Sequence, residues 1–289
     1  MQYIACRICV MDKCEIFKLI ASQIAQRELV FPTGALVALK LHQALDDPDC
    51  HVNAAEKLIQ AEPLLAARVI AIANSIIYNR FGREVTDVRT AVSRIGFGTV
   101  RSTAMALVVR QMAGNSVDPR HKELVNKLWE HTAHVASLSN VIARYVTRQD
   151  PDTAMFAGII HEIGGFYMLS RAGDFPGLLE GDFADWIETG ESEVGRAVLK
   201  KLSVPESISA AIEEYWDGFL AMPAVTLADT LLLADELAPL PSPLRHLNGV
   251  SEEGGMAASV EMMIGEETLS RILAEAAEEV ASLTRALQF

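Results

Sequence analysis

Apolar residues recur along most of this chain at the three- and four-residue spacing of an amphipathic α-helix. The clearest stripe lies between residues 123 and 146, and it consists of Leu124, Leu128, His131, Val135, Leu138, Ile142 and Tyr145. This spacing predicts one helix with a single buried side. His131 therefore lies on the side that faces a core, although it is a polar residue.

Turn and capping residues predict where the other helices begin and end. Pro63 and Pro151 each suit the first turn of a helix, where a proline loses no hydrogen bond. Asn74 and Ser75 indicate a helix end, and the Gly96 to Gly98 stretch is expected to divide the helix that contains it. The expected helices cover a short lead-in within 1–28, then a helix marked by Leu36, Leu39 and Leu45, and the ranges 54–60, 63–74, 91–112, 123–146, 153–169, 190–202, 206–216 and 265–289.

The segment 153–169 is apolar nearly all round, so we expect it at the centre of the fold. It contains Gly158, Gly164 and Gly165, and each glycine costs about 1 kcal/mol relative to alanine in a helix. We expect a close approach between helices to be the reason that these glycines are accepted.

The last helix has one apolar face, made of Leu269, Ile272, Leu273, Ala276, Val280 and Leu283. Burying one large aliphatic side chain stabilises a protein by about 1.5–3 kcal/mol. We therefore predict that this helix docks on the body of the protein.

The composition agrees with an all-α fold and excludes several functions. The chain has 289 residues, of which 50% are hydrophobic and 6% aromatic, enough for one large domain or two modest ones. A net charge of −13 argues against unspecific binding to nucleic acid. No apolar run is long enough to span a bilayer, and Arg7 and Asp12 interrupt any signal-peptide core. We expect a cytoplasmic protein that binds neither DNA nor membranes.

The cysteines are unevenly distributed. Cys6 and Cys9 form a C-x-x-C pair, Cys14 follows closely and Cys50 stands apart. A structural zinc site needs four ligands, usually from two such pairs, and a redox motif of this kind accompanies a βαβ pattern. Reduced thiols are therefore the favoured interpretation, and the sequence assigns Cys6, Cys9 and Cys14 no role.

Short motifs along the chain occur in a recognisable order. They are Leu29-Val30-Phe31-Pro32, Asp47-Pro48, Leu58-Ile59, Glu62-Pro63, Ala73-Asn74-Ser75 with Tyr78, Ala91-Val92, Ile95-Gly96, Trp129-x-His131-Thr132, Val194-Gly195 and Pro205. Their order resembles the HDOD family, the HD-related output domain of bacterial signalling proteins, from about residue 29 to residue 236.

The resemblance implies an N-terminal helical bundle joined to an HD-like helical bundle. The implied domain is 29–236, divided into 29–115 and 116–236, after a lead-in of 1–28 and before a linker and C-terminal helical extension of 237–289. It also implies a regulatory role of the response-regulator output type in two-component signal transduction. The implied partner is a histidine kinase or another regulator, and a homodimer stays open.

Metal-dependent phosphohydrolases of the HD superfamily hold their ions with a lone His, an adjacent His-Asp pair and a late Asp. The matching positions here are His131, His161-Glu162 and Asp229. Further departures from the active HD-GYP pattern, besides Glu162, are Gly165, Glu191 and the pair Tyr215-Trp216. We expect no catalysis and no cofactor. A core His131 with one hydrogen-bond partner and a helix-capping Asp229 are favoured over metal binding.

Two other functions stay open. A residual divalent metal at His131, His161 and Asp229 would suit a phosphohydrolase of nucleotides or cyclic dinucleotides. A nucleotide sensor could instead use the degenerate pocket without cleaving its ligand.

A basic stretch is the other candidate site. Six arginines lie between residues 80 and 110 against Glu84 and Asp87, which suggests a surface for an anionic protein partner at Arg80, Arg83 and Arg89. Solvated helix faces with local ion pairs are the competing and favoured interpretation.

Overall fold

All regular secondary structure among the described residues is helical, as the sequence predicts. The computed structural model describes residues 11–26, 50–113, 118–181, 183–221, 223–245 and 266–288, with isolated positions between 38 and 45. No β-strand occurs in these ranges. The helices are α2 (Lys13–Gln26), α4 (Val52–Gln60), α5 (Pro63–Ala73), α6 (Val88–Met112), α7 (Pro119–Ile142), α8 (Pro151–Ile160), α9 (Ile163–Ser170), α10 (Glu191–Lys201), α11 (Glu206–Asp217), α12 (Leu227–Glu236) and α14 (Glu266–Leu287), with π-helical turns at Ala143–Thr147 and Trp186–Gly190.

The helix starts follow from local chemistry. α5 and α8 begin at Pro63 and Pro151, as expected. The carboxylate of Asp150 accepts a hydrogen bond from the backbone N–H of Thr153 and so caps α8. In α6, Gly96 has a φ of 75°, so the helix bends at the predicted interruption.

One expected helix is divided in two. The segment 153–169 forms α8 and α9 with a break at His161 and Glu162, where Glu162 has non-helical backbone angles (φ −108°, ψ 24°). The expectation of one continuous helix was therefore wrong. The break turns the His161-Glu162 pair into the interior, since both residues are buried.

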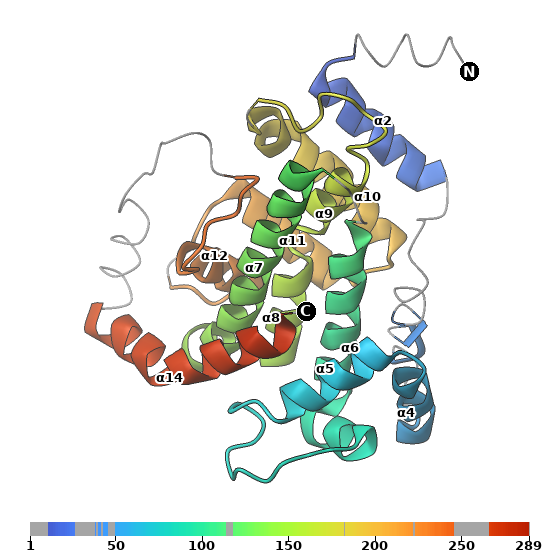
Figure 1. Ribbon diagram of the computed structural model, residues 1–289. Coiled ribbons are helices and arrows are strands. Elements are labelled where there is room, and N and C mark those ends of the chain that lie inside the picture. Colours follow the sequence, from blue (N-terminus) through green and yellow to red (C-terminus); the bar gives the residue numbers. More distant parts are fainter. Residues whose placement is uncertain are drawn as a thin grey trace.

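α7 and α8 lie side by side at the centre of the molecule (Figure 1). A Cβ atom on Gly158 of α8 would lie 2.7 Å from the Cα atom of Ala136 on α7. A Cβ atom on Gly164 of α9 would lie 2.8 Å from the backbone of Gly195 on α10. The expected reason for these glycines is confirmed, because the helix backbones come too close for any side chain.

The C-terminal helix α14 packs across α7 and α5, as predicted (Figure 1). The Thr284 hydroxyl bonds to the Ser137 hydroxyl of α7 at 3.0 Å, and Leu283 is fully buried. Glu279 pairs with Arg144 at 3.4 Å. One buried apolar cluster therefore extends from Ile16 in α2 to Leu287 in α14.

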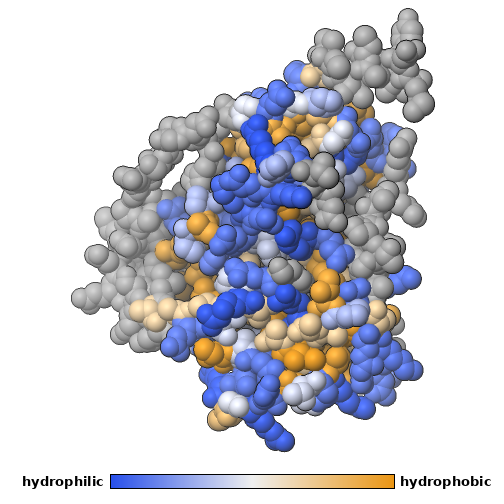
Figure 2. Space-filling model, in the orientation of Figure 1, coloured by the Kyte–Doolittle hydropathy of each residue, from blue (hydrophilic) through white to orange (hydrophobic). Residues whose placement is uncertain are grey.

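One face of the molecule is mainly polar. Figure 2 shows hydrophilic residues over much of one face, with hydrophobic residues visible in the seams between them. None of the described helices is both long and apolar enough to cross a membrane.

Candidate functional site

Two buried histidines from neighbouring helices face one another. His131 comes from the middle of α7 and His161 follows the last residue of α8, and their ring centroids are 5.5 Å apart. The Nδ1 atom of His131 is 2.8 Å from the carbonyl oxygen of Leu240, and that of His161 is 2.7 Å from the carbonyl oxygen of Gly158. A carbonyl oxygen only accepts, so Nδ1 carries the hydrogen in both rings. In the neutral rings, each Nε2 atom therefore offers a lone pair.

Asp235, in the last turn of α12, completes the group. Its Oδ1 atom is 3.2 Å from Nε2 of His131. Its Oδ2 atom accepts a hydrogen bond from the Tyr215 hydroxyl at 3.0 Å and lies 3.8 Å from Nη1 of Arg245. Ligand atoms of His131, His161 and Asp235 all lie within 4.8 Å of one another. Two imidazoles and a carboxylate form a donor set that suits a divalent transition metal.

Glu162 adds a second carboxylate beside the histidines. Its Oε2 atom is 3.8 Å from Nε2 of His131 and 4.0 Å from Nε2 of His161. Its Oε1 atom accepts a hydrogen bond from the Ser242 hydroxyl. The longer side chain of Glu therefore still reaches the group, although it replaces the Asp of the phosphohydrolase pattern.

The pKa values of the two histidines are shifted in opposite directions. Burial by itself lowers the pKa of His131, but the carboxylates of Asp235 and Glu162 outweigh it and raise the pKa to about 9. Burial and the nearby His131 lower the pKa of His161 to about 3. Burial raises the pKa of Glu162 to about 7 against the opposing effect of His131. Without a metal ion, His131 is therefore positively charged at neutral pH, and His161 stays neutral.

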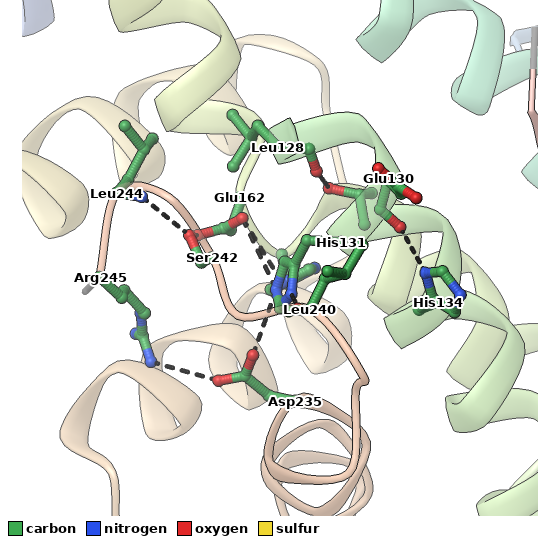
Figure 3. A network of polar contacts seen from close by, with 12 residues as sticks. Leu128, Glu130, His131, His134, Glu162, Asp235, Leu240, Ser242, Leu244 and Arg245 are labelled. Atoms are coloured by element: carbon green, nitrogen blue, oxygen red, sulfur yellow. Dashed lines mark hydrogen bonds and ion pairs between the residues drawn. The ribbon is translucent and has the colours of Figure 1, made fainter. Parts of the chain in front are cut away.

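A segment of the chain from Pro239 to Arg245, here called the strap, lies across this group (Figure 3). Its carbonyl at Leu240 bonds to His131, and its hydroxyl at Ser242 bonds to Glu162. Arg245 at its end binds both carboxylate oxygens of Glu191, at 3.3 and 3.0 Å. The strap therefore contacts the group with backbone, hydroxyl and guanidinium groups in turn.

Most of the residues that depart from the phosphohydrolase pattern contact the strap. Glu162 holds Ser242, and Glu191 holds Arg245. The Arg245 guanidinium also lies 4.3 Å from the centroid of the Tyr215 ring. A Cβ atom at position 165 would come within 2.5 Å of the Leu244 side chain, so Gly165 leaves room for Leu244. Trp216 is the exception, since its indole ring packs against Gly195 instead.

The structure does not bring Asp229 to the histidines. Its carboxylate accepts hydrogen bonds from the backbone N–H groups of Ala221, Val225 and Thr226 at 2.9, 2.9 and 2.8 Å. Together with Thr226 it forms a capping box at the start of α12. The favoured interpretation of Asp229 as a helix cap therefore agrees with the geometry, and Asp235 takes its place in the group. The spacing Thr226-x-x-Asp229 is typical of a capping box, and this signal in the sequence could have assigned Asp229 to the helix start and left Asp235 for the histidine group.

The basic stretch is largely tied to the protein itself. Five of its six arginines contact other residues. Arg94 donates to the Ala73 carbonyl, Arg101 lies over the Phe156 ring, and Arg110 donates to Asn126. Arg80 is 3.6 Å from Glu279, and Arg89 donates to Asn53 at 2.9 Å. Both of these side chains and that of Arg83 are exposed. The three arginines of the predicted partner surface are thus the most exposed of the six, and the other three are half-buried.

The two cysteines among the described residues take no part in this group. Cys14 and Cys50 are free and partly buried. Cys6 and Cys9 lie outside the described residues, so the C-x-x-C interpretation stays a sequence prediction.

The chain is similar to known proteins over most of its length. The model of the HDOD domain family matches residues 31–217. A protein from Shewanella amazonensis SB2B, provisionally named a metal-dependent phosphohydrolase, has a similar structure with a TM-score of 0.71 at 22% identity, covering 96% of this chain and 99% of that one. An HDOD domain protein of unknown function from Geobacter sulfurreducens has a TM-score of 0.58 at 22% identity, covering 94% and 97%. No curated protein matches the chain significantly. At these identities, the two solved structures establish a shared fold.

Proposed function

This chain belongs to the HDOD domain family, and we propose that it is a non-catalytic signalling module that acts through contacts with other proteins. The observation that carries the proposal is the strap across the histidine group. A catalytic metal site keeps a coordination position open for water or substrate. Here the side chains of His131 and His161 are fully buried and that of Glu162 is 2% exposed. The chain's own Leu240 and Ser242 stand where a substrate would have to enter.

The residues nevertheless fit a divalent metal ion. The Nε2 atom of His161 and the Oε2 atom of Glu162 are buried without a hydrogen-bond partner, and the buried Nε2 atom of His131 faces the Asp235 carboxylate at 3.2 Å. Ligands about 2.1 Å from a tetrahedral ion lie roughly 3.4 Å from one another. The His131–Asp235, His131–Glu162 and His161–Glu162 separations are 3.2, 3.8 and 4.0 Å, and the ligand atoms of His131, His161 and Asp235 all lie within 4.8 Å of one another, so the group could contract around an ion by small side-chain movements. An ion bound there would act as a Lewis acid on any oxygen that could reach it. The Asp235 side chain is 23% exposed, and we infer that the strap hinders the approach of a substrate oxygen from this side.

Turnover assays test the proposal directly. We expect the purified chain to hydrolyse neither phosphomonoesters nor cyclic dinucleotides in the presence of Mn²⁺, Mg²⁺ or Fe²⁺. Metal-dependent turnover that disappears in His161→Ala would show that the chain is a phosphohydrolase, the second candidate function, which the His131, His161 and Asp235 group favours. A thermal-shift screen with nucleotides tests the third candidate, a nucleotide sensor.

We further propose that the module is cytoplasmic and that its partner is an acidic signalling protein, such as a histidine kinase or a regulator. The supporting feature is the exposed loop between α5 and α6. Phe81 is 100% exposed there, between the exposed Arg80 and Arg83, and aromatic residues and arginine are typical anchors of protein interfaces. The side chain of Asn74 bonds to both the N–H and the carbonyl of Val85 and so closes this loop.

Charge reversal tests the partner surface. Changing Arg80, Arg83 and Arg89 to Glu should slow association with the cognate kinase or regulator, and added salt should weaken the wild-type rate. Arg196→Glu, on the α10 surface, is the control and should leave the rate unchanged. Association of the triple variant at the wild-type rate would show that the partner binds elsewhere. A second copy of the chain as the partner would appear as a dimer that the triple variant loses.

A further inference from the structure

The four polar side chains of the buried group are organised in the same way. In each side chain, one polar atom faces the centre of the group and a second polar atom, on the outer side, forms a hydrogen bond. The inward atoms are Nε2 of His131, Nε2 of His161, Oε2 of Glu162 and Oδ1 of Asp235. Nε2 of His131 faces Oδ1 of Asp235 at 3.2 Å, and the inward atoms of His161 and Glu162 have no hydrogen-bond partner. The outward atoms are all occupied, by the Leu240 carbonyl, the Gly158 carbonyl, the Ser242 hydroxyl and the Tyr215 hydroxyl respectively.

The strap supplies much of this outer layer. The Leu240 carbonyl fixes the ring of His131 in the tautomer whose Nε2 faces inward. The Ser242 hydroxyl orients Glu162, and Arg245 lies 3.8 Å from the outward oxygen of Asp235. Three of the four inward-facing side chains are therefore positioned by residues from one short segment.

Outer groups of this kind are worth about 10- to 100-fold in metal affinity, because they orient the ligands and raise their basicity. Ligand binding and the conformation that favours it are linked reciprocally. If the docked strap strengthens the binding of an ion, the ion must stabilise the docked strap by the same factor.

We propose that a divalent metal ion and the strap bind cooperatively, so that the ion locks Pro239–Arg245 onto the body of the protein. Leu240, Ser242 and Arg245 act as positioning residues, since none of them reaches the ion. This inference rests on the proposed function in one respect. In a non-catalytic module, a docked strap would change the surface that a partner protein contacts, and would not open a path for a substrate. The strap is thereby the element through which metal occupancy changes the surface of the module.

The test measures Zn²⁺ affinity and strap protection in the full chain. Zn²⁺ alone is titrated in competition with a chromophoric chelator, against the wild type, Ser242→Ala and Arg245→Gln. We expect each variant to bind Zn²⁺ at least about tenfold more weakly. Arg196→Gln is the matched control, because Arg196 makes a similar two-bond contact with Glu213 at 3.1 and 3.0 Å on α10 and α11. Its Zn²⁺ affinity should equal that of the wild type.

Hydrogen exchange of the strap provides the second readout. Zn²⁺ should slow exchange of the amides of Leu240, Ser242, Leu244 and Arg245 in the wild type, and His161→Ala should abolish this protection. Wild-type Zn²⁺ affinity in both strap variants, or strap exchange that is indifferent to Zn²⁺, would overturn the coupling. The same holds if the wild type binds no Zn²⁺, an outcome that leaves the non-catalytic proposal standing. Turnover, in contrast, would refute that proposal and leave the coupling to be judged by these two measurements.

Discussion

Replacing Asp229 by alanine separates its role from that of Asp235. The carboxylate of Asp229 accepts three backbone hydrogen bonds of 2.8–2.9 Å, and the residue is 2% exposed. Loss of the capping contact and of two further amide partners costs about 1 kcal/mol each, so we expect a loss of about 3 kcal/mol in the free energy of unfolding. The measurement is urea denaturation, in which the midpoint should fall while the slope stays the same.

The control is the second aspartate of the same helix. Asp235→Asn keeps the volume of the side chain but removes the charge that faces His131. It should abolish Zn²⁺ binding, whereas Asp229→Ala should bind Zn²⁺ as tightly as the wild type at temperatures where it is folded. Loss of Zn²⁺ binding in a folded Asp229→Ala protein would refute the assignment of Asp229 to the cap. A change in stability below about 1 kcal/mol would refute the energetic argument.

Three further predictions concern other contacts. Gly164→Ala should destabilise the protein by up to about 3 kcal/mol in urea denaturation, because its new methyl group would meet the backbone of Gly195. Gly173→Ala is the control and should be neutral, since nothing lies within 4 Å of the added methyl group. Equal effects of the two substitutions would contradict the backbone contact. Deletion of residues from 265 onward should lower the melting temperature or cause association by uncovering the site of Leu283, and an unchanged monomer would count against docking of α14. Burial alone would raise the pKa of Asp229, but its backbone hydrogen bonds outweigh burial and lower it. The wild type should therefore be more stable than Asp229→Asn by its full amount above about pH 4, and this difference in the free energy of unfolding should shrink as the pH falls through the native pKa. A difference independent of pH in chemical denaturation would contradict this.

The helices could be predicted because their signals are local. First-turn prolines, the capping Asp150 and the four-three stripe of α7 each report on one or two helical turns. The break between α8 and α9 could not be predicted, since residues 153–169 are apolar nearly all round and contain no proline. His161 and Glu162 leave the helical path in favour of contacts with distant residues, and periodicity contains no information about those.

The candidate site shows the same division. The motif order identified His131, His161 and Glu162, and the structure brings these three together. Asp229 was predicted as the late Asp of the motif, and Asp235 in the same helix was not considered, because the motif order alone does not distinguish two aspartates so close in sequence. The strap was expected to be a linker, because its prolines exclude a helix and nothing in its composition indicates contacts with residues about 80 positions earlier, such as the one between Ser242 and Glu162.

The continuous core that extends from α2 to α14 has a consequence for the way the chain melts. Bundles with separate cores unfold independently, whereas shared burial makes their unfolding all-or-none. α6 packs against α5 on one side and against α8 on the other, so it belongs to both halves of the predicted domain. Calorimetry should therefore record one endotherm whose van't Hoff enthalpy equals the calorimetric enthalpy. A mutation anywhere along this core then lowers the population of the whole folded protein, and its effect reaches a binding surface that it does not touch.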